Sequence, residues 1–185
     1  MLGGGSQFVN AVKKVIPGTT AYAVVYPASF GSDSPNVGVK DTLKYFENRP
    51  KECPEQRYVM SGYSQGGVVM HRAAVKMDKS LLQNRIVAAV TFGDGGQLAT
   101  KEKPLYSSPV GPIPVWPLEL DGRIKFNCYP GDPVRRFHLV RLKHRRLIDV
   151  RYANPAVSIS SRTYRTILAT TAKRARNLCY SSGRR

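Results

Sequence analysis

The stretch GYSQGG, Gly62 to Gly67, is the most informative part of this sequence. It follows the apolar run Tyr58-Val59-Met60 and leads into the apolar run Val68-Val69-Met70, so a strand is expected to pass into a helix here. The pattern G-x-S-x-G at such a junction is typical of a nucleophile elbow, a sharp turn that lifts a serine hydroxyl clear of the backbone. Glycine and serine are also common in ordinary turns, so a catalytic serine needs partners elsewhere in the chain.

Short apolar runs alternate with segments of helical spacing along the chain. Strands are expected at residues 20–26, 57–62, 85–92 and 123–128. Helices are expected at residues 8–16, 39–46, 65–77 and 163–178. Residues 101–117 hold five prolines and are expected to form an irregular loop. The alternation predicts an α/β fold, with a mainly parallel sheet covered by helices on both faces.

Three polar residues follow successive predicted strands. Ser64, Asp94 and Asp132 come after the second, third and fourth strands, and the active site of such a sheet lies beyond its carboxyl ends. A serine nucleophile needs a histidine base and an acid that orients the base, in the chain order Ser, acid, His. Asp132 is the preferred acid. Asp94 is the rival, although its position is more typical of a residue that caps a turn.

The histidine base is ambiguous, because two of the three histidines follow Asp132. His144 is preferred and His138 is the alternative, and each is also compatible with an ordinary surface histidine in a basic segment. His71 lies about two turns beyond Ser64 on the expected helix and is interpreted as a surface or packing residue. The backbone amide of Gln65, at the start of that helix, is expected to bind the oxyanion.

Length and charge limit the classes of protein to consider. The chain has 185 residues, enough for one domain with a substantial core. It contains no apolar run long enough for a transmembrane helix, and its first residues lack the pattern of a secretory signal. Its net charge is +17, of which +13 falls between Arg135 and the end. This basic segment predicts either a solvated face or a contact with an anionic polymer or membrane, and it lacks the aromatic residues of a base-stacking platform.

Three segments resemble the fungal cutinase and acetylxylan esterase family. Residues 53–74, CPEQRYVMSGYSQGGVVMHRAA, are similar to the family's nucleophile region, which has Cys-Pro ahead of the strand and G-Y-S-Q-G at the elbow. Residues 90–97, VTFGDGGQ, resemble the loop after the next strand, and residues 124–133, IKFNCYPGDP, resemble the segment that carries the catalytic aspartate. The resemblance covers roughly residues 4–133, and residues 134–185 form an atypical basic segment of the same single domain.

The resemblance implies a lidless serine esterase with a three-layer α/β/α fold of the α/β-hydrolase type. It implies Ser64 as nucleophile, Asp132 and His144 as its partners, and the Gln65 amide as oxyanion donor. The implied substrates are cutin polyester, short-chain esters or acetylated xylan, and no cofactor or metal is expected. The family further implies a secreted monomer with disulfide bonds that acts on plant cell walls, with no specific nucleic-acid partner.

The sequence departs from the family at three places. The comparison with the family implies that its first strand is missing here, and with it a second oxyanion donor, a contribution of about 3 kcal/mol to the barrier. Arg135 stands where the family has the cysteine that pairs with Cys128, and Cys179 is a possible partner for Cys53 or Cys128. The family's H-x-x-Y pattern around the histidine is not matched. An inactive cutinase-like binding protein with a basic tail is therefore the alternative interpretation.

Overall fold

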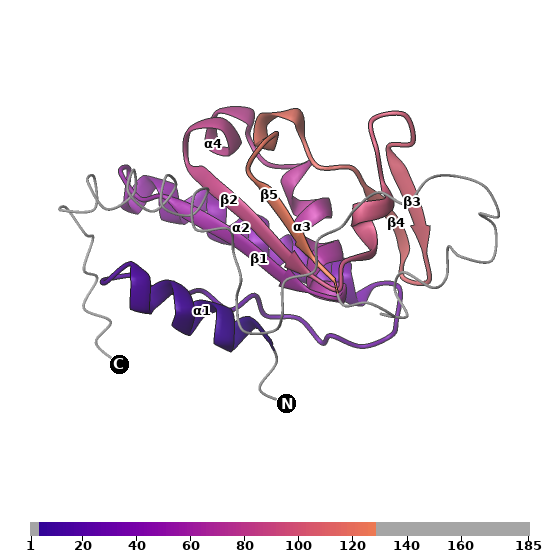
Figure 1. The fold of residues 1–185 in the computed structure, drawn as a ribbon, viewed down its shortest axis with the longest axis horizontal. Helices are drawn as coiled ribbons and strands as arrows, with labels where there is room; N and C mark the ends of the chain where they lie inside the picture. The colour runs from indigo at the N-terminus through magenta and orange to yellow at the C-terminus, as the bar shows by residue number, and fades with distance from the viewer. Residues whose placement is uncertain (1–3, 129–185) are drawn as a thin grey trace.

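A parallel β-sheet between two layers of helices organises the protein. The computed structural model describes residues 4–128, with the backbone alone for residues 4–6. Within this part of the chain the sheet has three strands in the order β1-β2-β5, which are Tyr58–Tyr63, Ile86–Phe92 and Ile124–Asn127 (Figure 1). Both strand pairs are parallel. The predicted strands at residues 57–62, 85–92 and 123–128 are thus confirmed to within a residue or so at their ends.

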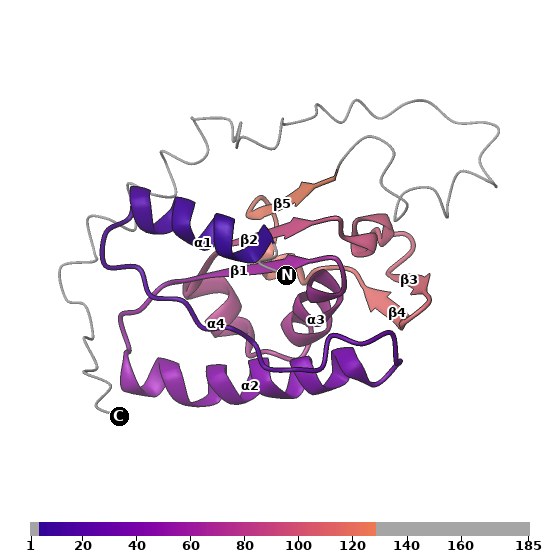
Figure 2. The same ribbon diagram turned by 90° about the horizontal axis from the view of Figure 1, so that it is seen from below.

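The helices lie on both faces of this sheet, which confirms the predicted three-layer α/β arrangement. Helix α1, Gly4–Val15, covers one face, and the opposite face carries α2, α3 and α4, which are Ser34–Glu52, Gln65–Ala74 and Lys79–Asn84 (Figure 2). The phenyl rings of Phe8 in α1 and Phe92 in β2 meet edge to face at 5.8 Å. None of the helices within residues 4–128 is both long and apolar enough to cross a membrane.

The carboxyl ends of the three strands meet at one edge of the sheet. Tyr63 is in register with Phe92, and Phe92 is in register with Asn127. The residues that follow these strand ends therefore emerge side by side. This geometry brings the turn at Ser64 next to the turn at Asp94, as the order of the predicted strands indicated.

The core lies between the sheet and helices α2 to α4. Strand β2 is central and almost continuously buried, as expected for a parallel strand covered on both faces. The fully or almost fully buried apolar side chains of this core are Val69, Ala73, Ala74, Leu82, Ile86, Ala89 and Leu120. Tyr58 packs edge to face against Phe46, so helix α2 is fixed on β1 by aromatic contacts.

The strand predicted at residues 20–26 is wrong, because these residues form neither a strand nor a helix. Their polar groups bond to helix α2 and not to a strand: the Val25 N–H and the Tyr22 hydroxyl both donate to the Asp41 carboxylate, each at 2.9 Å. The side chain of Tyr26 still packs against the core. Only Val24 and Tyr26 of this run are partly buried and its other residues are exposed, so the apolar pattern did not report burial either. Within residues 4–128, β1 pairs with β2 alone.

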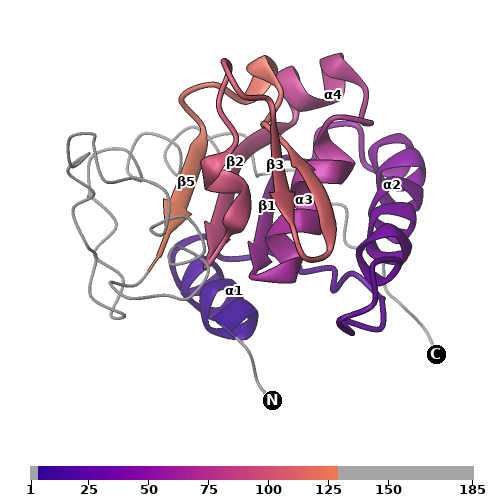
Figure 3. The ribbon, with the colours of Figure 1, turned by 90° about the vertical axis from the view of Figure 1, so that its right-hand side faces the viewer.

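The irregular loop predicted at residues 101–117 contains an antiparallel hairpin. Its strands are β3, Leu105–Ser108, and β4, Gly111–Pro114, and it lies beside α3 (Figure 3). Prolines are tolerated here because each strand of a two-stranded ribbon has an outer edge that needs no ladder N–H. Gly111 occupies the left-handed region at the turn, with φ of 92°. Short 3-10 helices, η1 at Gly95–Leu98 and η2 at Leu118–Leu120, flank the hairpin along the chain.

The helix predictions hold in place but not always in length. Helix α1 begins at Gly4, four residues before the predicted range of 8–16, and α2 begins at Ser34 and continues past Pro50 to Glu52. The helix predicted at residues 65–77 ends at Ala74, and α4 follows as a separate helix. The helix predicted at residues 163–178 lies outside the described residues.

Candidate active site

Ser64 stands at the junction of β1 and α3 in a strained conformation. Its φ and ψ are 49° and −115°, and its side chain is exposed. A residue other than glycine at positive φ costs roughly 1–3 kcal/mol and persists only where its surroundings hold it. Here the Ser64 N–H donates to the Phe92 carbonyl at 2.8 Å, and its own carbonyl accepts from the Gly67 N–H at 2.9 Å. The turn has the geometry of a nucleophile elbow, as the motif predicted.

The Gln65 amide lies in the first turn of α3, next to Ser64. The first N–H groups of a helix have no acceptor within the helix, and the helix dipole adds partial positive charge to them. Helix α3 has no acidic residue in its first turn to neutralise that charge. The surroundings of the Gln65 amide are therefore suited to an anionic oxygen, although its role as oxyanion donor stays a prediction.

The side chain of Gln65 is anchored to the segment that precedes α2. Its Nε2 donates to the Ser29 carbonyl at 2.7 Å, and its Oε1 accepts from the Ser34 hydroxyl at 3.3 Å. The same hydroxyl accepts from the Ser29 N–H at 3.1 Å. Ser29 and Ser34 could not be predicted as neighbours of the site, because their partner Gln65 is more than 30 residues away. Their bonds fix the loop between Tyr26 and α2 beside the elbow.

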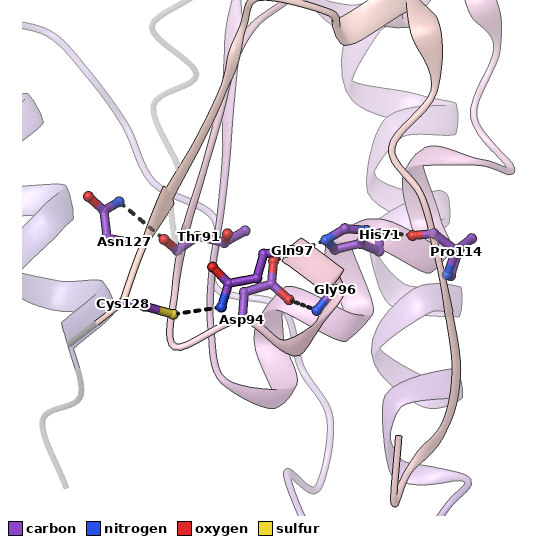
Figure 4. A network of polar contacts seen from close by, with 8 residues as sticks. All are labelled: His71, Thr91, Asp94, Gly96, Gln97, Pro114, Asn127 and Cys128. Atoms are coloured by element: carbon purple, nitrogen blue, oxygen red, sulfur yellow. Dashed lines mark hydrogen bonds and ion pairs between the residues drawn. The ribbon is translucent and has the colours of Figure 1, made fainter. Parts of the chain in front are cut away.

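Asp94, the rival acid, is occupied elsewhere. Its carboxylate is almost completely buried, with Oδ1 accepting from the Gly96 N–H at 2.8 Å and Oδ2 lying 3.0 Å from His71 Nε2 (Figure 4). Asp94 thus caps the turn that leads into η1, as its position in the sequence indicated. Each oxygen already has a partner within the fold, and the side chain is only 1% exposed.

His71 is a buried packing residue and is not available as the base. Its Nδ1 donates to the Pro114 carbonyl at 2.6 Å, and its Nε2 faces Asp94. Its ring packs against the indole of Trp116, with the ring centroids 4.3 Å apart. Since both ring nitrogens are engaged, His71 cannot take a proton from Ser64.

The turn after β2 is also joined to the end of β5. The Gly93 N–H donates to the Asn127 carbonyl at 2.8 Å, and Gln97 Nε2 donates to Cys128 Sγ at 3.1 Å (Figure 4). Within residues 4–128, no disulfide bond joins Cys53 to Cys128. The same part of the chain contains no group of three or more His, Cys, Asp or Glu side chains arranged to hold a metal ion.

The remaining predicted site residues lie outside the described part of the chain. These are Asp132, His138 and His144, and the basic segment of residues 134–185 lies there too. The structure therefore brings Ser64, Gln65 and the rival Asp94 together at one edge of the sheet. The roles of the other three stay predictions.

A three-layer α/β fold with an exposed serine at an elbow defines the α/β-hydrolase class. The family model for cutinase matches residues 2–158, and this chain belongs to the cutinase family. It is 30% identical over 135 residues to a cutinase of Monilinia fructicola, covering 70% of this chain and 59% of that protein. It is 31% identical over 115 residues to acetylxylan esterase 2 of Talaromyces purpureogenus, covering 50% and 49%.

The fold comparison agrees with the sequence comparison. A solved structure of an acetylxylan esterase superposes with a TM-score of 0.57 at 25% identity, covering 71% of this chain and 76% of that chain. The chain spans about half to three fifths of the length of the two relatives named above. The two relatives named above are thus carboxylic ester hydrolases by name.

Proposed function

We propose that this chain hydrolyses carboxylic esters through an acyl-enzyme on Ser64, with Asp132 and His144 as the other members of a catalytic triad. One observation carries the proposal. Ser64 is exposed and held at positive φ between β1 and α3, a conformation that costs free energy and presents its hydroxyl to solvent. A turn that only connected a strand to a helix would have no need of a strained serine.

The chemistry follows from the proposed roles. The imidazole of His144 takes the Ser64 proton as the hydroxyl oxygen attacks the ester carbonyl carbon. The Gln65 N–H binds the resulting oxyanion, and Asp132 stabilises the imidazolium. The tetrahedral intermediate expels the alcohol, which receives the proton from His144. Water then attacks the acyl-enzyme with His144 as base, releasing the carboxylic acid and restoring the Ser64 hydroxyl.

The strand register supports Asp132 as the acid. Strand β5 ends at Asn127, two strand positions from Tyr63, and that separation is roughly 10 Å at the usual spacing of strands. Asp132 follows Asn127 by five residues, and five residues reach about 17 Å at most. The chain that leaves β5 is therefore long enough to bring a carboxylate to the elbow. The rival Asp94, two residues after the end of β2, already interacts with His71 and Gly96.

The names of the relatives support the proposed substrate classes. Proteins called cutinase and acetylxylan esterase are among those that this chain resembles. We therefore propose cutin polyester, short-chain esters or acetylated xylan as substrates, and an extracellular monomeric enzyme without cofactor.

Hydrolysis of p-nitrophenyl acetate and p-nitrophenyl butyrate tests this proposal. The protein and a Ser107→Ala control, which changes an exposed serine on β3, are expected to hydrolyse both esters at the same rate. Ser64→Ala is expected to lower kcat by at least about 10³-fold. Equal rates for the unchanged protein and Ser64→Ala would contradict the proposal and favour a cutinase-like binding protein that uses its basic segment.

Two histidine variants identify the base. His144→Ala is expected to lower kcat by a factor similar to that of Ser64→Ala, and Asp132→Asn by about 10⁴-fold. His138→Ala is expected to leave kcat unchanged. A loss of activity in His138→Ala with full activity in His144→Ala would assign the base to His138.

A further inference from the structure

The buried pair His71–Asp94 lies beneath the elbow and has no role in the proposed chemistry. His71 comes from α3, Asp94 from the turn after β2, and the Pro114 carbonyl that accepts from His71 comes from β4 (Figure 4). The two side chains are 0% and 1% exposed. Three separate elements are thus joined through one imidazole ring.

The hydrogen bonds fix how many protons the pair holds. A carbonyl oxygen only accepts, so the hydrogen between His71 and Pro114 is on Nδ1. Nε2 and Asp94 Oδ2 are 3.0 Å apart, and one further proton lies between them, on the ring or on the carboxyl. In either case the pair as a whole is neutral, which suits its buried position. Removal of one partner leaves a buried polar group unpaired, which is unfavourable.

The pair is in direct contact with the elbow. A Cβ atom at Gly67 would stand 2.7 Å from Asp94 Cγ, so the carboxylate packs directly on the backbone of Gly67. The Gly67 N–H is the group that bonds to the Ser64 carbonyl. On the other side, the Ser64 N–H bonds to Phe92, only two residues before Asp94. The segment from Phe92 to Asp94 therefore holds the strained serine from both sides.

We propose that His71 and Asp94 are positioning residues for the ester hydrolysis. Their hydrogen bonds hold the turn after β2 against Gly67 and thereby keep Ser64 and the Gln65 amide in their reactive geometry. This inference rests on the proposed function of Ser64. Neither side chain touches the reacting atoms, so their effect on catalysis acts through the backbone of the elbow.

Two variants of Asp94 separate hydrogen bonding from mere filling of space. Asp94→Asn preserves every bond of the pair: its oxygen accepts from the Gly96 N–H, and its amide donates to Nε2 of a neutral His71. Asp94→Ala leaves both His71 Nε2 and the Gly96 N–H without that partner. His71→Phe is a second disruptive variant, because it keeps a ring against Trp116 but loses both hydrogen bonds.

Two measurements on the full chain, both well below the melting temperature, test the inference. The first is hydrogen exchange of the hydrogen-bonded elbow amides, those of Ser64 and Gly67, and the second is kcat and KM for p-nitrophenyl butyrate. Asp94→Ala and His71→Phe are expected to speed exchange at the elbow by about ten-fold or more. They are expected to lower kcat by about 10²-fold with little change in KM, since a displacement of about 1 Å at a reactive group has this effect. Asp94→Asn is expected to resemble the unchanged protein in both.

Each other outcome has a definite meaning. If the disruptive variants lower the melting temperature but leave exchange at the elbow and kcat unchanged, the pair only stabilises the fold and the inference is overturned. If Asp94→Asn is as damaging as Asp94→Ala, positioning by hydrogen bonds is also overturned. If the unchanged protein shows no ester hydrolysis above Ser64→Ala, the proposed function fails, and exchange at the Ser64 and Gly67 amides still decides whether the pair holds the elbow.

Discussion

Gly62 and Gly66 are in van der Waals contact across the elbow, so closely that a Cβ atom at position 62 would stand 2.3 Å from the Gly66 carbonyl oxygen. No side-chain movement can relieve this contact, since the oxygen belongs to the backbone. The two glycines are not equivalent, however. A Cβ atom at position 66 would meet nothing nearer than the Tyr26 hydroxyl, at 3.8 Å. Of the two, only Gly62 is required by the packing of β1 against α3.

Substitution of these glycines is therefore expected to have unequal effects. Gly62→Ala is expected to lower the free energy of unfolding by about 1–3 kcal/mol, because the backbone of α3 must shift. The same shift is expected to reduce ester hydrolysis. Gly66→Ala, the matched control, is expected to change the free energy of unfolding by less than about 1 kcal/mol, since alanine has a higher helix propensity than glycine. Urea unfolding of both variants checks this, and equal losses would show that the contact at Gly62 does not control the elbow.

The Gln65 side chain offers a test of which atom binds the oxyanion. Gln65→Ala removes the bonds to Ser29 and Ser34 but keeps the backbone amide. We expect kcat to fall less than about ten-fold, because loss of an oxyanion donor itself costs about 10²–10³-fold. Steady-state kinetics beside the unchanged protein provides the measurement. A loss of 10²-fold or more would assign an essential role to the side chain and contradict the role given to the amide.

Tyr58 is expected to make the protein less stable at alkaline pH. Burial raises the pKa of its phenol above the ordinary value. The folded state therefore holds the proton more tightly than the unfolded state, so this contribution to stability is complete below the unfolded pKa of about 10 and is lost as the pH rises through the folded pKa. Tyr58→Phe is expected to reduce the fall in unfolding free energy between pH 9 and pH 11.

Urea unfolding at a series of pH values measures that fall. Tyr63→Phe, which changes an exposed tyrosine at the end of the same strand, serves as the control and is expected to leave the fall unchanged. Burial also raises the pKa values of Tyr26 and Tyr45, so a part of the dependence is expected to remain in Tyr58→Phe. An identical fall in Tyr58→Phe and the unchanged protein would contradict this account.

The elbow was predictable because its signal is local. The strand, the glycines and the helix around Ser64 are contiguous in sequence, and the structure reproduces all three. Residues 20–26 have the same apolar character as β1, yet whether a segment becomes a strand depends on a partner elsewhere in the chain. The Val25 N–H bonds to Asp41, and this part of the prediction failed for that reason. The β3–β4 hairpin was not predicted because its segment is rich in proline. Proline fits a strand only at positions where no N–H is needed for the ladder, and these positions are known only once the strand pairing is known.

The pairing of His71 with Asp94 could not be predicted from either residue. They are 23 residues apart, and each alone has an ordinary interpretation. Two glycines, Gly67 and Gly96, leave the space in which the pair packs. A Cβ atom at Gly96 would lie 2.4 Å from His71 Nε2, and one at Gly67 would lie 2.7 Å from Asp94 Cγ. These contacts depend on the folded structure and could not be read from the spacing of the four residues.

Covalent labelling tests the central claim about Ser64 most directly. A p-nitrophenyl phosphonate ester reacts with an activated serine hydroxyl, forms a phosphorus–oxygen bond and releases p-nitrophenol. Intact mass measurement and peptide mapping of the treated protein are expected to show one adduct per chain, located on Ser64 and absent from Ser64→Ala. An unmodified protein, or the same adduct mass on Ser64→Ala, would contradict the assignment of this serine as the nucleophile.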